Sequence, residues 1–229
     1  MITRIARTAG FSGLLAALLL TLLQSFWVAP LILQAETYET AAPAAEHHEH
    51  GEAAAPHEHS AEAWAPEDGW QRILSTTGGN LVVAVGFALI LAALYSLRAP
   101  GRVTTGALWG LAGFVVFCLA PTLGLPPELP GTAAADLGQR QTWWIGTAAA
   151  TAAGLALLVF ARHWLFKVLG VALLVIPHLI GAPQPAVHES LAPEALETQF
   201  KIASWLTNAA FWLALGLLSA WLFRRSSQH

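Results

Sequence analysis

Histidine and acidic residues alternate in one short stretch of the sequence, and these residue types suit metal chemistry. Five imidazoles lie within thirteen residues, interleaved with glutamates: His47, His48, His50, His57 and His59. A neutral imidazole offers a nitrogen lone pair that suits cobalt, nickel, copper and zinc. The fixed ligand spacing of a structural zinc site is absent, and no cysteine accompanies the histidines. The pattern therefore predicts reversible and fairly unselective binding of divalent transition metals.

These histidines belong to a segment, residues 34–79, whose composition differs from that of the rest of the chain. It is rich in Ala, Glu, His and Pro and has few other aliphatic side chains over Glu36–Trp70, so we expect a flexible, acidic, His-rich outer loop. Its nine acidic residues, against one arginine, would attract cations by electrostatic focusing. The alternative is a solvated acidic linker whose histidines have no role.

A second set of candidate ligands is provided by Glu128 and Asp136, with Arg140 as a candidate partner for one of them. Glu128 belongs to the turn-rich stretch Pro121–Gly131, which its prolines should make rigid. The two carboxylates are therefore candidate fixed ligands at the outer mouth of a pathway. The alternative is an interfacial corner with a surface ion pair.

His178 follows Pro177 inside an apolar run, where an ionisable side chain is a functional hypothesis by default. The proline frees the carbonyl of Leu173, so an imidazole and a carbonyl could both face a cation. The alternative places His178 at the outer interface, bonded to a neighbour.

Further along, His188 and Glu189 are candidate ligands in the last outer loop. Glu194, Glu197 and Lys201 fall three and four apart, which favours the solvated face of a helix. Gly106, Gly110 and Gly113 mark a helix that packs closely against a neighbour.

The elements that must position these residues are membrane helices. Of 229 residues only 11% are charged and 55% are hydrophobic, which excludes an ordinary soluble protein. A helix needs about 20 apolar residues to span a bilayer. Six runs without Asp, Glu, Lys or Arg are candidates: Ala9–Leu33, Asn80–Leu97, Thr104–Leu123, Thr142–Ala161, Phe166–Ala182 and Ile202–Phe223. We predict an all-α, polytopic transmembrane helix bundle of about six spans, in one integral membrane domain over residues 1–229. Five spans are possible, because Phe166–Ala182 is short.

The first run could instead be a signal peptide, because Arg4 and Arg7 precede it. It is longer than the apolar region of a signal peptide and no Ala-x-Ala site closes it, so a retained helix is favoured.

The charges predict an orientation. With six spans and a cytoplasmic N-terminus, eight Lys and Arg fall inside and three outside, so both termini are predicted to be cytoplasmic. All 14 acidic residues then lie outside. This asymmetry predicts a cation-attracting outer face, in which a metal ion approaches from outside.

Catalytic and nucleotide-binding motifs are absent from the sequence. There is no Gly-x-x-x-x-Gly-Lys-Ser/Thr loop, no His-Glu-x-x-His and no Gly-x-Ser-x-Gly. We therefore expect no enzyme, no tightly bound cofactor and no nucleic-acid partner. The expected partners are a divalent metal ion and the lipid bilayer.

The sequence resembles the CbtA family of predicted bacterial cobalt transporter subunits over nearly the whole chain. The resemblance rests on the His-bearing loop and on Leu123–Gly131, Ala135–Leu137, Arg140-Gln141, Trp143-Trp144 and Ile176–Pro183. It implies cobalt uptake across the cytoplasmic membrane, usually linked to cobalamin synthesis, with a small single-span partner (CbtB) that has its own His-rich segment. It also implies about five spans, and the positions carried over are Glu128, Asp136, Arg140 and His178.

Two functional hypotheses follow. The first is import of a divalent cation, cobalt preferred, after capture by outer histidines and carboxylates. The second is a non-transporting membrane scaffold or metal-buffering subunit of a transport complex, with nickel as a possible metal, since imidazole and carboxylate serve both metals.

Overall fold

The structure is a computed structural model that describes residues 1–41, 66 and 69–226. Helices account for its regular structure, apart from one isolated antiparallel bridge between Thr132 and Ser190. The elements in chain order are α1 (Ile2–Leu23), η1 (Gln24–Val28), α2 (Ala29–Ala41), α3 (Trp70–Leu97), α4 (Val103–Phe114), η2 (Val115–Leu119), α5 (Ala120–Thr122), α6 (Leu137–Phe160), α7 (Trp164–Ile180) and α8 (Glu194–Arg225). The π-helical turns η1 and η2 join their neighbours into two longer continuous helices.

The prediction of an all-α membrane bundle is confirmed. Within the described residues, five helices are long and apolar enough to cross a bilayer: Ile2–Ala41, Trp70–Leu97, Val103–Thr122, Leu137–Phe160 and Glu194–Arg225. The sixth, α7, has 17 residues, fewer than the roughly 20 that a span needs. It corresponds to the predicted run Phe166–Ala182 and ends earlier, because the chain turns away at Gly181, whose φ is +85°.

Residues 34–41 and 70–79, which were predicted to belong to the outer loop, are helical. Ala35 in α2 is buried in a cluster with Leu196 and Phe200 of α8, so tertiary packing extends the first helix beyond its apolar run. Arg72 of α3 forms an ion pair with Glu36 of α2 at 2.5 Å, which joins the two helices. The rest of the predicted loop lies outside the described residues, apart from Pro66 and Gly69.

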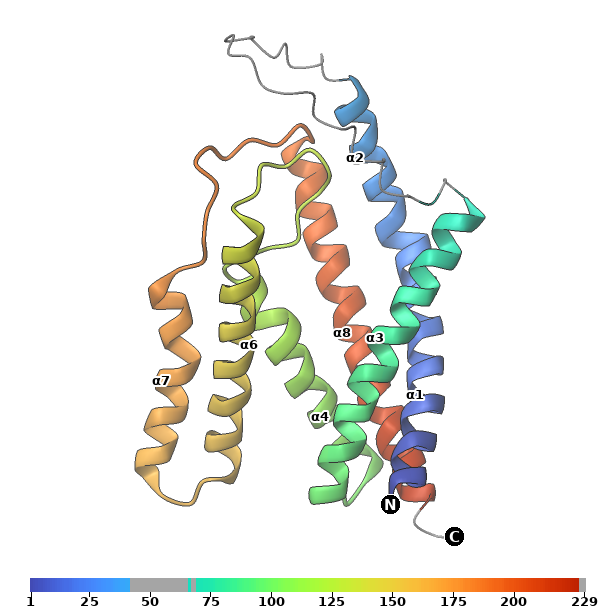
Figure 1. Ribbon diagram of the computed structural model, residues 1–229, viewed down its shortest axis with the longest axis vertical. Coiled ribbons are helices and arrows are strands. Elements are labelled where there is room, and N and C mark those ends of the chain that lie inside the picture. Colours follow the sequence, from blue (N-terminus) through green and yellow to red (C-terminus); the bar gives the residue numbers. More distant parts are fainter. Residues whose placement is uncertain (42–65, 67–68, 227–229) are drawn as a thin grey trace, which may run out of the picture.

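Four helices form the main bundle: α1 packs along α3 and α8, and α4 packs along α8 (Figure 1). The α4–α8 contact is close because Gly106 and Gly110 face the backbone of α8, where an added Cβ would overlap carbonyl oxygens of Gly216 and Trp212. Such close approach through small residues is typical of membrane helices. The expectation of a close-packing helix at these glycines is therefore confirmed.

The long helix α6 and the shorter α7 form an antiparallel hairpin beside the main bundle (Figure 1). Gly154 of α6 and Gly170 of α7 face each other, and a Cβ on either would lie 2.8–2.9 Å from the opposite carbonyl oxygen. The hairpin contacts the rest of the protein mainly through α6, which packs on η2 and α5.

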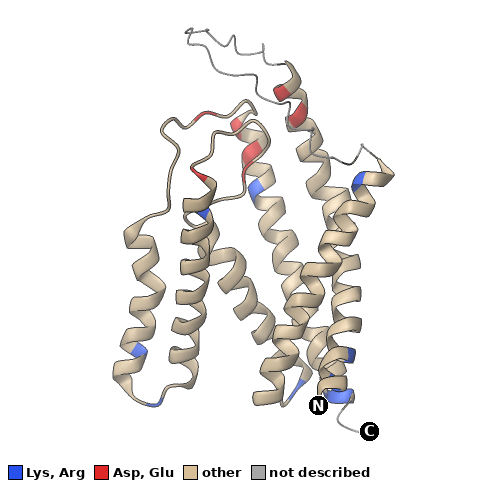
Figure 2. Ribbon diagram, viewed as in Figure 1, with Lys and Arg blue, Asp and Glu red and all other residues tan. Residues whose placement is uncertain are grey.

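The two ends of the molecule carry opposite charge. Figure 2 shows the described Asp and Glu residues at the end where the α5–α6 and α7–α8 loops lie, which we call the acidic end. Most Lys and Arg lie at the opposite, basic end, together with the start of α1 and the end of α8. There Arg4 donates hydrogen bonds to the Phe223 carbonyl at 2.5 and 3.1 Å and lies over the Phe223 ring. For the described residues, the charge separation predicted from the sequence is thus present in the fold.

Candidate functional site

A cavity of about 210 Å³ opens at the acidic end, between the α5–α6 loop, the α7–α8 loop and the start of α8. Its ionisable lining comes from three segments: Glu128 and Arg140 around the α5–α6 loop, His188 and Glu189 in the α7–α8 loop, and Glu197 and Lys201 on α8. Three carboxylates, two cations and one imidazole therefore share one cavity. Among the described residues, this is the candidate site.

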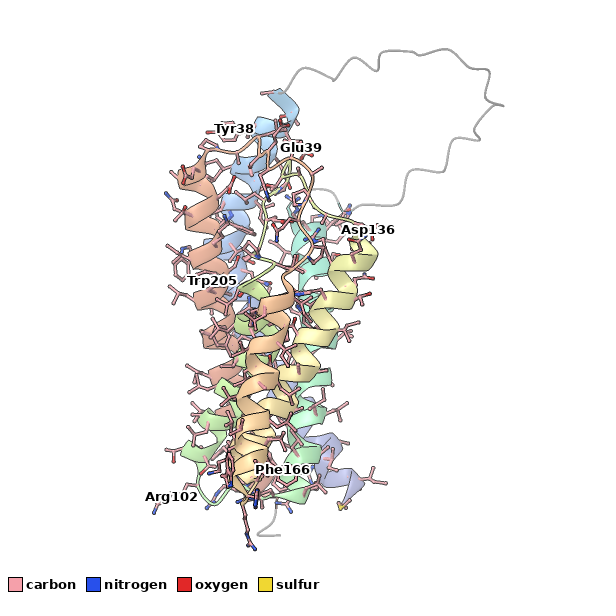
Figure 3. All side chains as sticks on the ribbon, turned by 90° about the vertical axis from the view of Figure 1, so that its left-hand side faces the viewer. Tyr38, Glu39, Arg102, Asp136, Phe166 and Trp205 are labelled. Atoms are coloured by element: carbon pink, nitrogen blue, oxygen red, sulfur yellow. The ribbon has the colours of Figure 1, made fainter. Side chains whose placement is uncertain are left out.

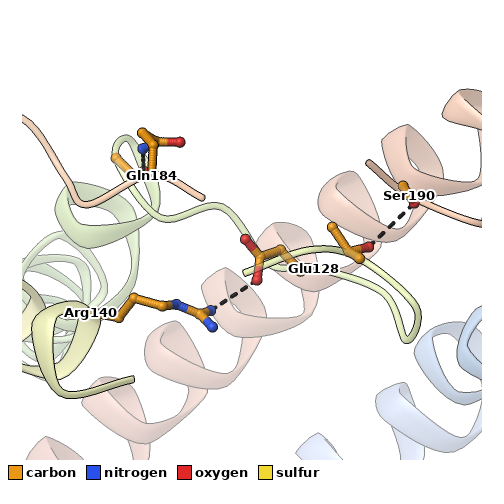
Figure 4. A network of polar contacts seen from close by, with 6 residues as sticks. Glu128, Arg140, Gln184 and Ser190 are labelled. Carbon is orange, nitrogen blue, oxygen red and sulfur yellow. Dashed lines mark hydrogen bonds and ion pairs between the residues drawn. The ribbon is translucent and has the colours of Figure 1, made fainter. Parts of the chain in front are cut away.

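Backbone contacts hold the two loops together beside the cavity. The Ala133 amide donates to the Glu189 carbonyl at 2.9 Å, and the Leu191 amide donates to the Gly131 carbonyl at 3.2 Å. The hydroxyls of Thr132 and Ser190 lie 3.3 Å apart (Figure 4). Glu189 is thereby held at a fixed position along the cavity wall, although its side chain is exposed.

The α5–α6 loop is also held by a buried leucine, Leu129, and bends at a glycine, Gly131. Leu129 is 4% exposed and packs in the cluster with Leu196 and Phe200, next to Glu128 in the sequence. Gly131 has φ of +76°, a conformation that L side chains rarely adopt, and an added Cβ would lie 3.0 Å from Leu191. The rigidity expected from the prolines thus has two further causes in the packing.

Glu128 and Arg140 form an ion pair in the cavity wall. Their Oε2 and Nη2 atoms are 2.9 Å apart, and both side chains are roughly three-quarters buried, at 26% and 29% exposure (Figure 4). The sequence left open whether Arg140 pairs with Glu128 or Asp136, and the structure places it against Glu128. Glu128 is therefore a carboxylate in the cavity that already has a cationic partner.

Asp136 lies elsewhere. It is the N-cap of α6, where its Oδ1 accepts a hydrogen bond from the Gln139 amide at 2.9 Å, and it is exposed at the top of that helix (Figure 3). A carboxylate at this position also stabilises the positive end of the helix dipole. Asp136 is not among the residues that line the cavity.

The second ion pair of the cavity joins Glu197 and Lys201, one turn apart on α8, at 3.3 Å. From the sequence, this face of the helix was predicted to be solvated. It instead faces the cavity, and the side chains are 21% and 33% exposed. The spacing of Glu197 and Lys201 predicted that they share one side of a helix. The rotation of α8 that points this side to the cavity is set by the packing of Leu196 and Phe200 in the neighbouring cluster.

His178 lies in the last turn of α7, half-buried, with its ring 6.1 Å from that of Trp143 in an edge-to-face arrangement. The Trp143 indole donates a hydrogen bond to the Pro177 carbonyl at 3.3 Å, and the helix continues through Pro177 to Ile180. His178 is thus packed between α6 and α7 and is not one of the residues that line the cavity.

Two residues that were not among the predicted site residues, Trp143 and Gln184, support this corner. Trp143 packs against Gly124, where an added Cβ would lie 2.5 Å from the indole, and so connects the loop to α6. Gln184 donates to the carbonyls of Gly124 and Ala182 at 3.4 and 3.3 Å (Figure 4). The Gly124 position and the paired Trp143-Trp144 were visible as a motif, but their contact partners were not.

The ligands in the described part of the chain do not form a ready chelate. No group of three His, Cys, Asp or Glu side chains within residues 1–41 and 69–226 is close enough to hold a metal ion. The five histidines of the predicted capture segment, His47, His48, His50, His57 and His59, lie outside the described residues.

The fold and the cavity define a polytopic helical membrane protein whose ionisable residues converge at one end of the bundle. Residues 2–224, nearly the whole chain, match the family described as "Probable cobalt transporter subunit (CbtA)", and the chain belongs to this family. The resemblance read from the sequence is therefore confirmed. No curated protein and no solved structure matches the chain.

Proposed function

We propose that this protein takes part in cobalt uptake across the bacterial cytoplasmic membrane and that its acidic end first binds the metal. The observation that carries the proposal is the cavity, which Glu128, His188 and Glu189 line together in a member of a cobalt transporter subunit family. Imidazole nitrogen and carboxylate oxygen together suit a divalent transition metal.

In the proposed orientation both termini are cytoplasmic and the acidic end faces outward. The positive-inside rule supports this, because most Lys and Arg lie at the basic end. An inside-negative membrane potential would then favour inward movement of a cation by about 2.3 kcal/mol per charge per 100 mV.

Capture begins, in this proposal, at the His-rich segment. The helices on either side of it, α2 and α3, are paired through Glu36 and Arg72 at the acidic end. Histidines on a tether raise the metal concentration near the cavity, and the acidic residues of the segment add to the attraction.

Binding within the cavity is proposed to be an exchange of cations. Glu128 is held by Arg140 and Glu197 by Lys201, so a divalent ion that binds either carboxylate competes with a resident cationic side chain. His188 and Glu189 are exposed in the cavity wall and would make the first contact. His178, packed against Trp143 nearby, remains our candidate for the outer end of the pathway.

Uptake of radioactive cobalt into cells tests the site. We expect Glu128→Gln, Glu189→Gln, His188→Ala and His178→Ala each to lower uptake at limiting cobalt by about tenfold, as for other changes in the surroundings of a bound metal. Glu194→Gln is the matched control, because Glu194 lies at the same end in the first turn of α8 but does not line the cavity. Unchanged uptake in all four variants would refute the site assignment.

Deleting residues 44–62 tests the capture step separately. The apparent affinity for cobalt should fall while the maximal uptake rate stays close to that of the unaltered protein, because the segment concentrates metal without forming the pathway. Complete loss of transport would contradict this division of roles.

A second candidate function is a scaffold or metal-buffering subunit of a transport complex, with cobalt or nickel as the metal. It is favoured by the lack of a three-ligand group in the described residues and by the exposed apolar surface of α7, which includes Val168, Val171 and Val175. A small single-span CbtB-like partner and a link to cobalamin synthesis belong to this proposal as to the first. Liposomes that contain only this chain separate the two functions, because a scaffold gives no metal flux.

A growth experiment decides between cobalt and nickel. It asks which of the two metals limits growth when the protein is removed.

A further inference from the structure

The basic end has a groove between the start of α4 and the end of α8. It has a volume of about 350 Å³ and is lined by Val103, Trp221, Arg224 and Arg225. We propose that this groove binds the phosphate of an anionic phospholipid headgroup. The proposal is independent of cobalt transport.

Arg224 builds the groove. Its guanidinium donates to the carbonyl of Pro100 at 3.0 Å and to that of Gly101, and these bonds fasten the α3–α4 loop to α8. The first turn of α4 is thereby held beside the arginines at the end of α8. A ligand in the groove therefore meets two helices whose relative position is fixed.

The start of α4 adds a favourable field for an anion. Arg102 is its N-cap, has extended backbone and makes no side-chain capping bond within the described chain. The first amide groups of a helix point outward and carry partial positive charge, which suits phosphate oxygens. Val103, the first residue of α4, is in the groove lining.

Arg225 in the groove lining and Arg102, next to Val103 in the sequence, both supply exposed charge at this end. Arg102 lies at the basic end and points away from the bundle (Figure 3), and Arg225 is exposed with its guanidinium 5.5 Å from the centre of the Trp221 ring. Trp221 is 43% exposed, and tryptophan is enriched at the level of lipid headgroups.

Charge complementarity selects the occupant. The described Asp and Glu residues all lie at the opposite end of the molecule (Figure 2), and no carboxylate lines this groove in the described chain. Basic pockets between membrane helices bind anionic headgroups. A phospholipid is also the anion present at this depth, since Leu97 and Leu108 nearby in the chain are exposed apolar side chains.

The test uses the full chain in phosphatidylcholine nanodiscs that contain phosphatidylglycerol, with bound phosphatidylglycerol measured by native mass spectrometry. Arg102→Gln with Arg225→Gln should weaken its binding by about 25-fold, because each basic residue near an anionic surface contributes about fivefold. Arg102→Lys with Arg225→Lys should keep most of the binding. The matched control is Arg162→Gln with Lys167→Gln, which removes two charges at the same end but on the α6–α7 turn and α7.

Loss of binding in the groove variant, with binding retained in the control and lysine variants, supports the proposal. It is overturned if the control loses as much as the groove variant, if the groove variant binds normally, or if inorganic phosphate displaces the lipid from the unaltered protein. Equal thermal unfolding temperatures of the four proteins, measured alongside, separate lost binding from lost folding.

Discussion

The main bundle and the α6–α7 hairpin are both packed through glycines, but the main bundle has a central helix, α8, that contacts three others. In the main bundle, α8 contacts α1, α3 and α4, and 44% of the residues in its most apolar stretch are buried. In the hairpin, 22% of the residues in the most apolar stretch of α6 are buried, and α7 packs chiefly against α6. The cavity lies where the two units meet, with Glu128 and Arg140 on the hairpin side and Glu197 and Lys201 on the bundle side. A site at such a junction changes shape when one unit shifts against the other.

The largest effect should come from filling the close contact in the bundle. Gly110→Leu places a side chain where the Trp212 carbonyl already lies, and overpacking of this kind should cost about 3 kcal/mol or more. Gly146→Leu is the control, because a Cβ at Gly146 in the hairpin meets nothing within 4 Å. Thermal unfolding in detergent measures both, and equal losses would mean that the bundle is no more tightly packed than the hairpin.

Breaking the ion pair on the hairpin side should strengthen metal binding. Arg140→Gln frees the Glu128 carboxylate from a partner worth about 1 kcal/mol, so cobalt affinity should rise about fivefold. Glu128→Gln should lower it. Metal titration of chains that also lack residues 44–62 isolates the cavity from the His-rich segment. A lower affinity in the Arg140 variant would show that Arg140 positions the site and does not compete with metal.

The connection of α7 to α6 depends in part on one indole. Trp143→Phe keeps the aromatic ring but removes the hydrogen bond to the Pro177 carbonyl, which should cost about 1 kcal/mol. Trp144→Phe, the neighbouring change, is the comparison, and the free energy of unfolding is the readout. If both variants are equally stable, the hairpin is held by ring packing alone.

The smallest effect is expected on the bundle side of the cavity. Lys201→Gln removes an ion pair between residues one turn apart on α8, which stabilises a helix by about 0.3–0.5 kcal/mol. Its influence on cobalt affinity should be smaller than that of Arg140→Gln, because a pair within one helix places no constraint on the hairpin. An equal or larger effect would place the metal nearer Glu197 than Glu128.

Helix existence could be predicted from the sequence because it depends on run length alone. The apolar runs around Asn80–Leu97 and Thr142–Ala161 each correspond to a helix in the structure. Helix ends were less predictable, since the polar residues at 34–41 and 70–79 are helical and have contacts to distant residues, Ala35 with Leu196 and Arg72 with Glu36. Hydropathy measures how favourably a segment transfers into the bilayer, so it does not show whether a helix continues outside the bilayer.

The candidate site was predictable residue by residue but not as a cavity. Glu128, His188 and Glu189 were identified from their types and loop positions, and all three line it. Asp136 was put in the same group, yet its position before a helix is also that of an N-cap, and both roles use the same carboxylate. Lys201 and Glu197 were assigned to a solvated face because helix periodicity cannot say which side meets a loop.

The continuous helix Ile2–Ala41 is about 60 Å long at 1.5 Å per residue, roughly twice the thickness of the hydrocarbon core. Tilted by about 20°, the average for membrane helices, it would still span about 56 Å along the membrane normal, more than the roughly 40–45 Å of the whole bilayer. The partner helix α3 is about 42 Å long and begins lower. The end of α2 therefore lies farther along the bundle axis than the start of α3 (Figure 1). In the proposed orientation, a cation from the solvent would meet the exposed carboxylate of Glu39, near the end of α2, before it reached the membrane surface.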